Sequence, residues 1–187
     1  KYPHELQRMY ILFNSVLNTN KKVNIINIDY CFEKKFKKRK IDKKYFVLNV
    51  GAGKKFRKWD IKNYILLGNK MEEKFNITPI YCGINEDFIA LQNASIKPSK
   101  NSMNLCGETT LEDLINIIKF CEFSISNDSA AAHLSIFLHK KTICIKSKFD
   151  HNRFFPYPKK IISDRENVVS KKNIADISVD DVLEIIV

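Results

Sequence analysis

The chain has 187 residues, 44% of them hydrophobic, so it is long enough to bury a full core and fits one domain better than two. Its 32 Lys and Arg residues against 21 Asp and Glu residues give a net charge of +11, which favours an anionic partner such as a nucleotide, a phosphorylated glycan, a membrane surface or a nucleic acid. No segment approaches the roughly 20 apolar residues of a membrane span, and five cysteines without Cys-x-x-Cys spacing favour a reduced, cytosolic setting over a disulfide framework.

The first 44 residues divide into three segments. Apolar residues recur at three- and four-residue spacing in residues 5–17, which predicts an amphipathic helix. Residues 22–28 have the pattern of a strand, and the lysine-rich residues 33–44 suit an exposed connection. We therefore expect a linker helix within residues 1–20 that leads into one domain formed by residues 21–187.

From residue 45 onward, short apolar segments alternate with helical patterns. Strands are expected at residues 45–50, 78–82, 102–106, 123–126 and 141–146, and helices at residues 61–75, 86–92, 111–121 and 129–138. Short buried strands separated by helices are typical of a parallel sheet that is covered on both faces. The sequence therefore predicts an α/β fold with a doubly wound, Rossmann-like parallel sheet.

Local signals refine the later part of the chain. Thr109 and Glu112 have the Thr-x-x-Glu spacing of a capping box, and Ser178-Val179-Asp180-Asp181 can cap a last helix. Residues 149–160, with Pro156 and Pro158, have the composition of a long surface loop.

Three loops after predicted strands are candidates for a binding site, because ligands of open parallel sheets bind beyond the carboxyl ends of the strands. The first contains Gly51-Ala52-Gly53, whose backbone N–H groups can approach an oxyanion, followed by Arg57 and Lys58, which can pair with phosphate. An ordinary strand-to-helix turn with surface lysines explains these residues equally well.

The second loop is Asn127-Asp128-Ser129-Ala130-Ala131-Ala132-His133. Its small residues keep the first turn of a helix open toward a diphosphate, and His133 can donate to the phosphate or to the leaving group. The alternative is that Asp128 is a simple N-cap and His133 a half-buried side chain with a hydrogen bond. In the third loop Asn85 and Glu86 follow a strand; a carboxylate there can hold ribose hydroxyls or simply compensate the helix dipole.

Taken together in this order, the motifs resemble glycosyltransferase family 9, the ADP-heptose:lipopolysaccharide heptosyltransferases and their relatives. The matching motifs are Val50-Gly51-Ala52 with Arg57-Lys58-Trp59, Gly107-Glu108-Thr109-Thr110-Leu111, and Asn127-Asp128-Ser129 with His133. Pro3-His4-Glu5-Leu6 resembles the start of the family's interdomain linker, and residues 177–182 resemble its terminal helix. The resemblance implies that the chain is the C-terminal half of a two-domain GT-B fold.

The resemblance also implies roles for individual residues. Asp128, Ser129 and His133 would contact the diphosphate and sugar of the donor, Arg57 would bind phosphate, and Asn85 or Glu86 would approach the ribose. The implied binding set is completed by Gly51, Ala52, Gly53, Lys58 and Ala130. The donor would be a nucleoside-diphosphate sugar, with ADP-heptose favoured, and the family uses neither a metal nor a cofactor.

An N-terminal domain that cannot be located in this sequence would supply the catalytic base and bind an anionic glycan or lipid-linked acceptor. The resemblance therefore predicts no catalytic residue in this chain, apart from a leaving-group contact by His133, and no transfer activity by this chain alone. The expected location is the cytoplasm, including the inner face of the bacterial inner membrane.

Three positions depart from the family pattern. Ala130 stands where the family usually has Gly, Ser147 where a Gly usually ends the next strand, and Asp60 where a Pro usually follows the Trp. A positive φ at residue 130 would strain an alanine. These departures keep open a second class of function, a non-catalytic interaction domain that retains the fold and has lost the donor site.

A third class is a basic nucleic-acid-binding module, which the net charge of +11 and the lysines of residues 34–44 favour. The aromatic residues Phe32, Phe36 and Tyr45 are too few and too irregularly spaced to form a stacking platform. We therefore expect no nucleic-acid partner.

Overall fold

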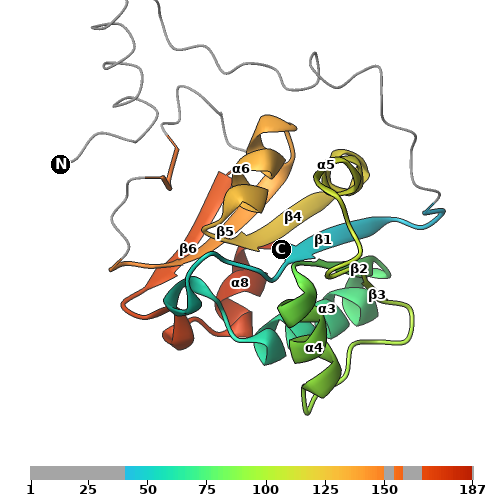
Figure 1. Ribbon diagram of the computed structural model, residues 1–187. Coiled ribbons are helices and arrows are strands. Elements are labelled where there is room, and N and C mark those ends of the chain that lie inside the picture. The colour runs from blue at the N-terminus through green and yellow to red at the C-terminus, as the bar shows by residue number, and fades with distance from the viewer. Residues whose placement is uncertain (1–40, 150–153, 158–165, 187) are drawn as a thin grey trace, which may run out of the picture.

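The computed structural model describes residues 41–149, 154–157 and 166–186. Within these ranges the chain forms a six-stranded sheet with helices on both faces (Figure 1). The α/β class expected from the sequence is therefore confirmed. The expected linker helix in residues 1–20, the strand at residues 22–28 and most of the lysine-rich connection lie outside the described residues.

All six strands are parallel. They are β1 (Tyr45–Asn49), β2 (Thr78–Cys82), β3 (Met103–Asn104), β4 (Phe123–Asn127), β5 (Lys141–Ser147) and β6 (Glu166–Lys171). Their order across the sheet is β3-β2-β1-β4-β5-β6, so the chain winds outward from β1 to β3 and then returns to the other side of β1. This is the doubly wound order of dinucleotide-binding folds, with its switch point between β1 and β4.

Five helices connect and cover the strands. They are α3 (Ile61–Phe75), α4 (Asn85–Asn93), α5 (Leu111–Phe120), α6 (Ala130–Phe137) and α8 (Val179–Ile186), together with the 3-10 turns η1 (Lys55–Arg57) and η3 (Ile174–Asp176). In Figure 1, α5 and α6 lie on one face of the sheet, and α3, α4 and α8 lie on the other. None of the helices in the described ranges has the length and hydropathy that a membrane span requires.

Strand β1 shows why both faces need a cover. Phe46 and Leu48 pack into the core that α3 and α8 share, while Tyr45 and Val47 pack into the core beneath α5. Successive side chains of a strand point to opposite faces, so a strand buried on both faces is apolar at every position. The apolar run at residues 45–48 is therefore consistent with the place of β1 in the middle of the sheet.

Strand β6 was not expected from the sequence. It contains only two apolar residues, Val168 and Val169, and it pairs with β5 alone. Edge strands are covered less completely than central ones, so they lack the continuous apolar signal by which the other strands were recognised.

The expected surface loop at residues 149–160 is confirmed only in part by the residues that the structure describes. Phe149 and Pro156 are exposed. Phe155 and Tyr157 are instead buried, and they form a small core cluster with Ala132, Ile136 and Cys144.

The capping box of α5 lies one residue later than expected. The Thr110 hydroxyl accepts a hydrogen bond from the Asp113 N–H at 3.1 Å, and the Asp113 carboxylate accepts from the Thr110 N–H at 3.0 Å, so Thr109 and Glu112 do not form the box. The expected cap of α8 is confirmed, because the Ser178 hydroxyl accepts from the Asp181 N–H at 3.1 Å.

Candidate functional site

A groove of about 400 Å³ opens at the carboxyl ends of β1, β2 and β4. Residues from the loops after these strands and from the first turns of α5 and α6 line it: Asn49, Gly51, Ala52, Gly53, Cys82, Gly83, Ile84, Thr109, Thr110, Leu111, Leu114, Ser129, Ala130 and Ala131. The groove lies at the switch point between β1 and β4, where ligands of doubly wound sheets bind. It is the candidate site.

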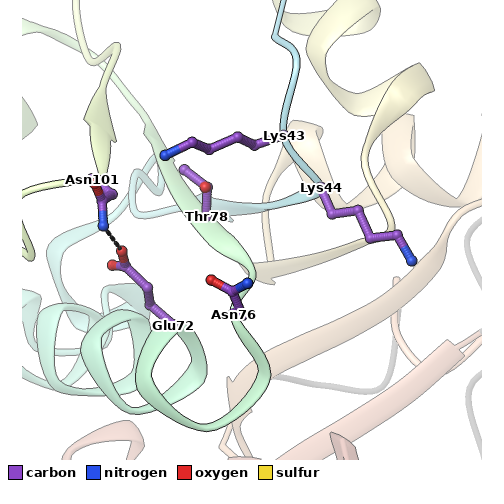
Figure 2. Close-up of a pocket in the computed structure, with 6 residues that line it drawn as sticks. All are labelled: Lys43, Lys44, Glu72, Asn76, Thr78 and Asn101. Carbon is purple, nitrogen blue, oxygen red and sulfur yellow. Dashed lines mark hydrogen bonds between the residues drawn. The ribbon is translucent and has the colours of Figure 1, made fainter.

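A second cavity of about 480 Å³ lies at the opposite edge of the sheet, beside the first residues of β1 and β2 (Figure 2). Its Glu72 carboxylate accepts a hydrogen bond from the Asn101 side chain at 2.7 Å. Figure 2 shows Lys43 and Lys44, both exposed, extending in different directions. These lysines do not converge on one point in the cavity, so it is a weaker candidate than the groove.

Asn127, the last residue of β4, fixes the glycine loop that forms one wall of the groove. Its side-chain amide donates to the carbonyl oxygens of Val50 at 2.9 Å and Gly51 at 3.3 Å, and its amide oxygen accepts from the Trp59 N–H at 2.9 Å. The buried Trp59 ring in turn donates to the Ile177 carbonyl at 2.8 Å. The β1 loop is thus tied both to β4 and to the segment before α8.

An ion pair joins the same loop to α4. The Lys58 ammonium lies 2.7 Å from the buried Asp87 carboxylate, which also accepts a hydrogen bond from the Ile84 N–H at 3.0 Å. A Cβ on Gly83 would lie 2.6 Å from an Asp87 carboxylate oxygen, and a Cβ on Gly51 would lie 3.0 Å from it. These two glycines therefore leave space for the Asp87 carboxylate.

The first turn of α6 lines the groove, and its N-cap residue makes no side-chain capping bond. Ser129 is the N-cap residue, so Asp128 is not; the Ser129 side chain caps no helix N–H group, and its hydroxyl lies 3.0 Å from the Ser126 hydroxyl. Ala130 is exposed, and its φ is not positive, because Asn76 and His139 are the only non-glycine residues with positive φ in the described part of the chain. The backbone strain considered for alanine at this position is therefore absent.

The structure divides the eleven predicted site residues into two sets. Gly51, Ala52, Gly53, Ser129 and Ala130 line the groove. The remaining residues stand around it and do not line it: Arg57, Lys58, Asn85, Glu86, Asp128 and His133.

The residues of the second set are placed differently from one another. Arg57 ends η1, with its guanidinium 5.8 Å from the centre of the Phe56 ring. Asn85 and Glu86 are exposed at the start of α4. Asp128 is buried, and the Nδ1 atom of His133 lies 2.6 Å from the Tyr157 hydroxyl oxygen.

Four residues of this region were assigned no role in the sequence analysis. Asn127 and Asp87 are buried polar side chains that hold the loops, and their pairing becomes visible only when β1, β2 and β4 are side by side. Ile84 and Leu111 line the groove with exposed fractions of 57% and 64%. Large apolar side chains left open to solvent in a groove are typical of binding surfaces, and no sequence pattern separates them from core residues.

Burial shifts the pKa values of ionisable groups beside His133. It raises the pKa of the Tyr157 hydroxyl well above its usual value, and nearby Glu166 and Asp128 raise it further, so the phenol stays protonated.

No group of three or more His, Cys, Asp or Glu side chains within the described ranges is arranged to hold a metal ion.

Comparison with known proteins identifies the family. Residues 1–178 match glycosyltransferase family 9 (heptosyltransferase). A lipooligosaccharide heptosyltransferase 2 of Campylobacter jejuni is 28% identical over 155 residues, which cover 78% of this chain and 47% of that protein. The chain therefore spans about half the length of the curated relative it matches.

Two solved structures show the same fold. The ADP-heptose lipopolysaccharide heptosyltransferase II of E. coli has a TM-score of 0.65 at 20% identity, covering 76% of this chain and 45% of that one. An E. coli heptosyltransferase solved with ADP has a TM-score of 0.73 at 15% identity, covering 100% of this chain and 57% of that one. The sheet is therefore the Rossmann-like half of a GT-B architecture, and with the match over residues 1–178 the chain belongs to glycosyltransferase family 9.

Proposed function

We propose that this chain binds the nucleotide-sugar donor of a glycosyltransferase that moves a sugar, heptose or a related one, to a cell-surface glycan such as the lipopolysaccharide core. One observation carries the proposal: the groove at the switch point is lined both by the glycine loop and by the first turn of α6, whose N-cap residue Ser129 makes no side-chain capping bond. Free N–H groups at a helix N-terminus, together with the helix dipole, favour a phosphate group.

The chemistry required of this site is stabilisation of a leaving nucleoside diphosphate. Donors placed in advance where negative charge develops lower the barrier to sugar transfer. Arg57 is the cation we assign to the phosphates, in the place of the family's phosphate-binding Lys, and the Lys58 ammonium pairs with Asp87. Asn127 keeps the glycine loop in place as charge builds up, and Asp128, Ser129 and His133 complete the contacts to the diphosphate and sugar.

The proposed donor is ADP-heptose, since a similar E. coli heptosyltransferase was solved with ADP and with ADP-2-deoxy-2-fluoro heptose. The exposed apolar side chains of Ile84 and Leu111 offer a surface against which a nucleotide base can pack, and Asn85 or Glu86 would approach the ribose.

We further propose that residues 1–20 are an interdomain linker and residues 21–187 the donor domain. An N-terminal domain outside this sequence would bind the anionic glycan or lipid-linked acceptor and supply the base, so this chain alone would bind donor without transferring it. The proposed location is the cytoplasm, including the inner face of the inner membrane.

Isothermal titration of the 187-residue chain with ADP, UDP and GDP sugars tests the proposal. Arg57→Ala is expected to weaken the binding of the preferred donor by about 10- to 100-fold, the size of one hydrogen bond to a charged group. Asp128→Ala is expected to weaken binding as well. Lys43→Ala, which removes a lysine at the opposite edge of the sheet (Figure 2), is the matched control and should leave affinity unchanged. Absence of binding to every nucleotide would refute the proposal.

A further inference from the structure

His133 is surrounded by aromatic side chains. Its ring stacks on Phe155 with centroids 4.6 Å apart and planes at 23°, and it meets the edges of Phe154 at 6.0 Å and Tyr157 at 5.6 Å. The Nδ1 atom lies 2.6 Å from the Tyr157 hydroxyl oxygen, within hydrogen-bond distance. The orientation of the imidazole is therefore set by residues 154–157, which follow β5 in the chain and lie far from the groove loops in sequence.

The segment that carries Tyr157 is itself held by strands β5 and β6. Its backbone N–H donates to the Glu166 carboxylate on β6 at 2.7 Å, and the buried Lys146 ammonium on β5 donates to the Phe155 carbonyl at 3.1 Å. The backbone is thus anchored at residues 155 and 157, so the Tyr157 hydroxyl is a fixed partner for the imidazole. Its hydrogen bond at Nδ1 limits rotation of the His133 ring.

The imidazole and the groove share helix α6. His133 lies one turn after Ser129, which lines the groove, and the His133 backbone N–H donates to the Ser129 carbonyl at 3.4 Å. The ring is therefore carried by the same short helix whose first turn lines the groove where the diphosphate would bind.

We propose that Tyr157 is a positioning residue: its hydroxyl fixes the orientation of the His133 imidazole and so sets how strongly that ring contacts the donor diphosphate. The inference rests on the proposed donor-binding function, since it requires His133 to contact the donor. Tyr157 itself touches no donor in this scheme. A tyrosine that only packs against α6 would contribute to stability alone.

A double-mutant cycle on ADP binding separates these two roles. Tyr157→Phe is expected to weaken ADP binding about fivefold, the size of one neutral hydrogen bond, in the otherwise unaltered chain. In the His133→Ala background the same substitution should have no further effect, because its route to the ligand is gone. Tyr45→Phe is the matched control: Tyr45 and Tyr157 are both 5% exposed, and the Tyr45 hydroxyl donates to the Ile117 carbonyl at 2.9 Å. That control is expected to change stability and leave ADP affinity as it was.

Equal losses in both backgrounds, or no loss in the unaltered background, would overturn the role of Tyr157. Failure of the proposed function looks different, because the unaltered chain would then bind no nucleotide. If Tyr157→Phe does not fold, ¹⁵N spectra of the His133 ring in the unaltered chain decide. ADP is expected to shift the Nε2 signal more than the Nδ1 signal, because Nδ1 stays with the Tyr157 hydroxyl. A larger shift at Nδ1 than at Nε2 would contradict the proposal.

Discussion

Asn127 is the residue on which the shape of the groove depends most. It is buried at the end of β4, and through three hydrogen bonds it holds Val50, Gly51 and Trp59. Each of these partners belongs to the loop after β1, so one side chain holds this loop against the end of β4 at the switch point. Its amide satisfies both donors and acceptors of the backbone, which neither an aspartate nor a leucine of similar size can do.

Asn127→Leu is expected to lower the free energy of unfolding by about 2–4 kcal/mol, because it leaves buried backbone groups without partners. Urea denaturation monitored by circular dichroism measures the change. Asn69→Leu is the control, since the Asn69 side chain also makes two hydrogen bonds to backbone atoms, to the Lys97 carbonyl at 3.0 Å and from the Ser99 N–H at 2.9 Å, but lies in a partly exposed position. An equal loss of unfolding free energy in the two variants would show that the Asn127 hydrogen bonds do not contribute more than those of Asn69.

Glu166 should make stability depend on pH. Burial raises the pKa of its carboxyl group to about 7, and the Tyr157 N–H and the Lys146 ammonium oppose this shift only in part. Between the unfolded pKa of 4.5 and the folded pKa of about 7, the native chain keeps a proton that the unfolded chain has lost. The stability gained from this proton is therefore present at pH 4.5 and below and is lost as the pH rises through 7.

Glu166→Gln keeps the shape of the protonated carboxyl group and does not titrate. Urea denaturation at intervals from about pH 5 to 8 should show the unaltered chain losing stability relative to this variant as the pH rises. A constant difference across this range would mean that the Glu166 pKa is not raised.

The helices and central strands were the elements that sequence patterns could locate. The buried strands β1 and β2 are mostly apolar, and α3 shows a clear helical period, so their bounds were predicted within a residue. Strand β6 lacks such a signal, because within the described residues only one side of it pairs with another strand. The burial of Phe155 and Tyr157 depends on α6, a contact that no local pattern encodes.

The site shows the same division between local and distant information. The loops after β1 and β4 could be predicted as neighbours because doubly wound sheets bring the ends of these strands together. The pairing of Lys58 with Asp87, 29 positions apart, could not be predicted in this way, since Glu86 and Asp87 are adjacent acidic residues. The backbone at the start of α4 determines which of the two carboxylates turns inward.

The cap of α5 gives a test at the level of one helix. Thr110→Ala removes the hydroxyl that accepts from the Asp113 N–H, and it should lower the free energy of unfolding by about 1 kcal/mol. Thr109→Ala is a control of the same chemical size, because the structure assigns no capping bond to Thr109; it should cost less than about 0.5 kcal/mol. The pairing expected from sequence, Thr109 with Glu112, predicts the reverse order, so thermal unfolding of both variants decides between them.

At the scale of the whole molecule, net charge and fold make different predictions about anions. A net charge of +11 attracts any polyanion, and this attraction is screened over about 8 Å at physiological salt. The groove at the switch point would instead recognise one ligand through fixed backbone and side-chain groups. Salt screens such short-range contacts much less than it screens attraction by net charge. Salt dependence therefore distinguishes the proposed donor domain both from a basic nucleic-acid-binding module and from a domain that has lost its site.

Thermal unfolding with ADP applies this distinction. At a concentration of about 100 times its dissociation constant, a ligand that binds only the folded chain contributes about 2.7 kcal/mol, which raises the Tm of a chain of this size by about 5–10 °C. We expect ADP to retain most of this effect in about 0.5 M NaCl, where sulfate at matched ionic strength and a DNA oligonucleotide lose theirs. Arg57→Ala, with affinity about 10- to 100-fold weaker, should remove about half or more of the ADP shift at the same ligand concentration. If ADP, sulfate and the DNA oligonucleotide all raise the Tm and all lose this effect as salt rises, the chain attracts anions by net charge alone. If no nucleotide raises the Tm, the chain has kept the fold and lost the donor site.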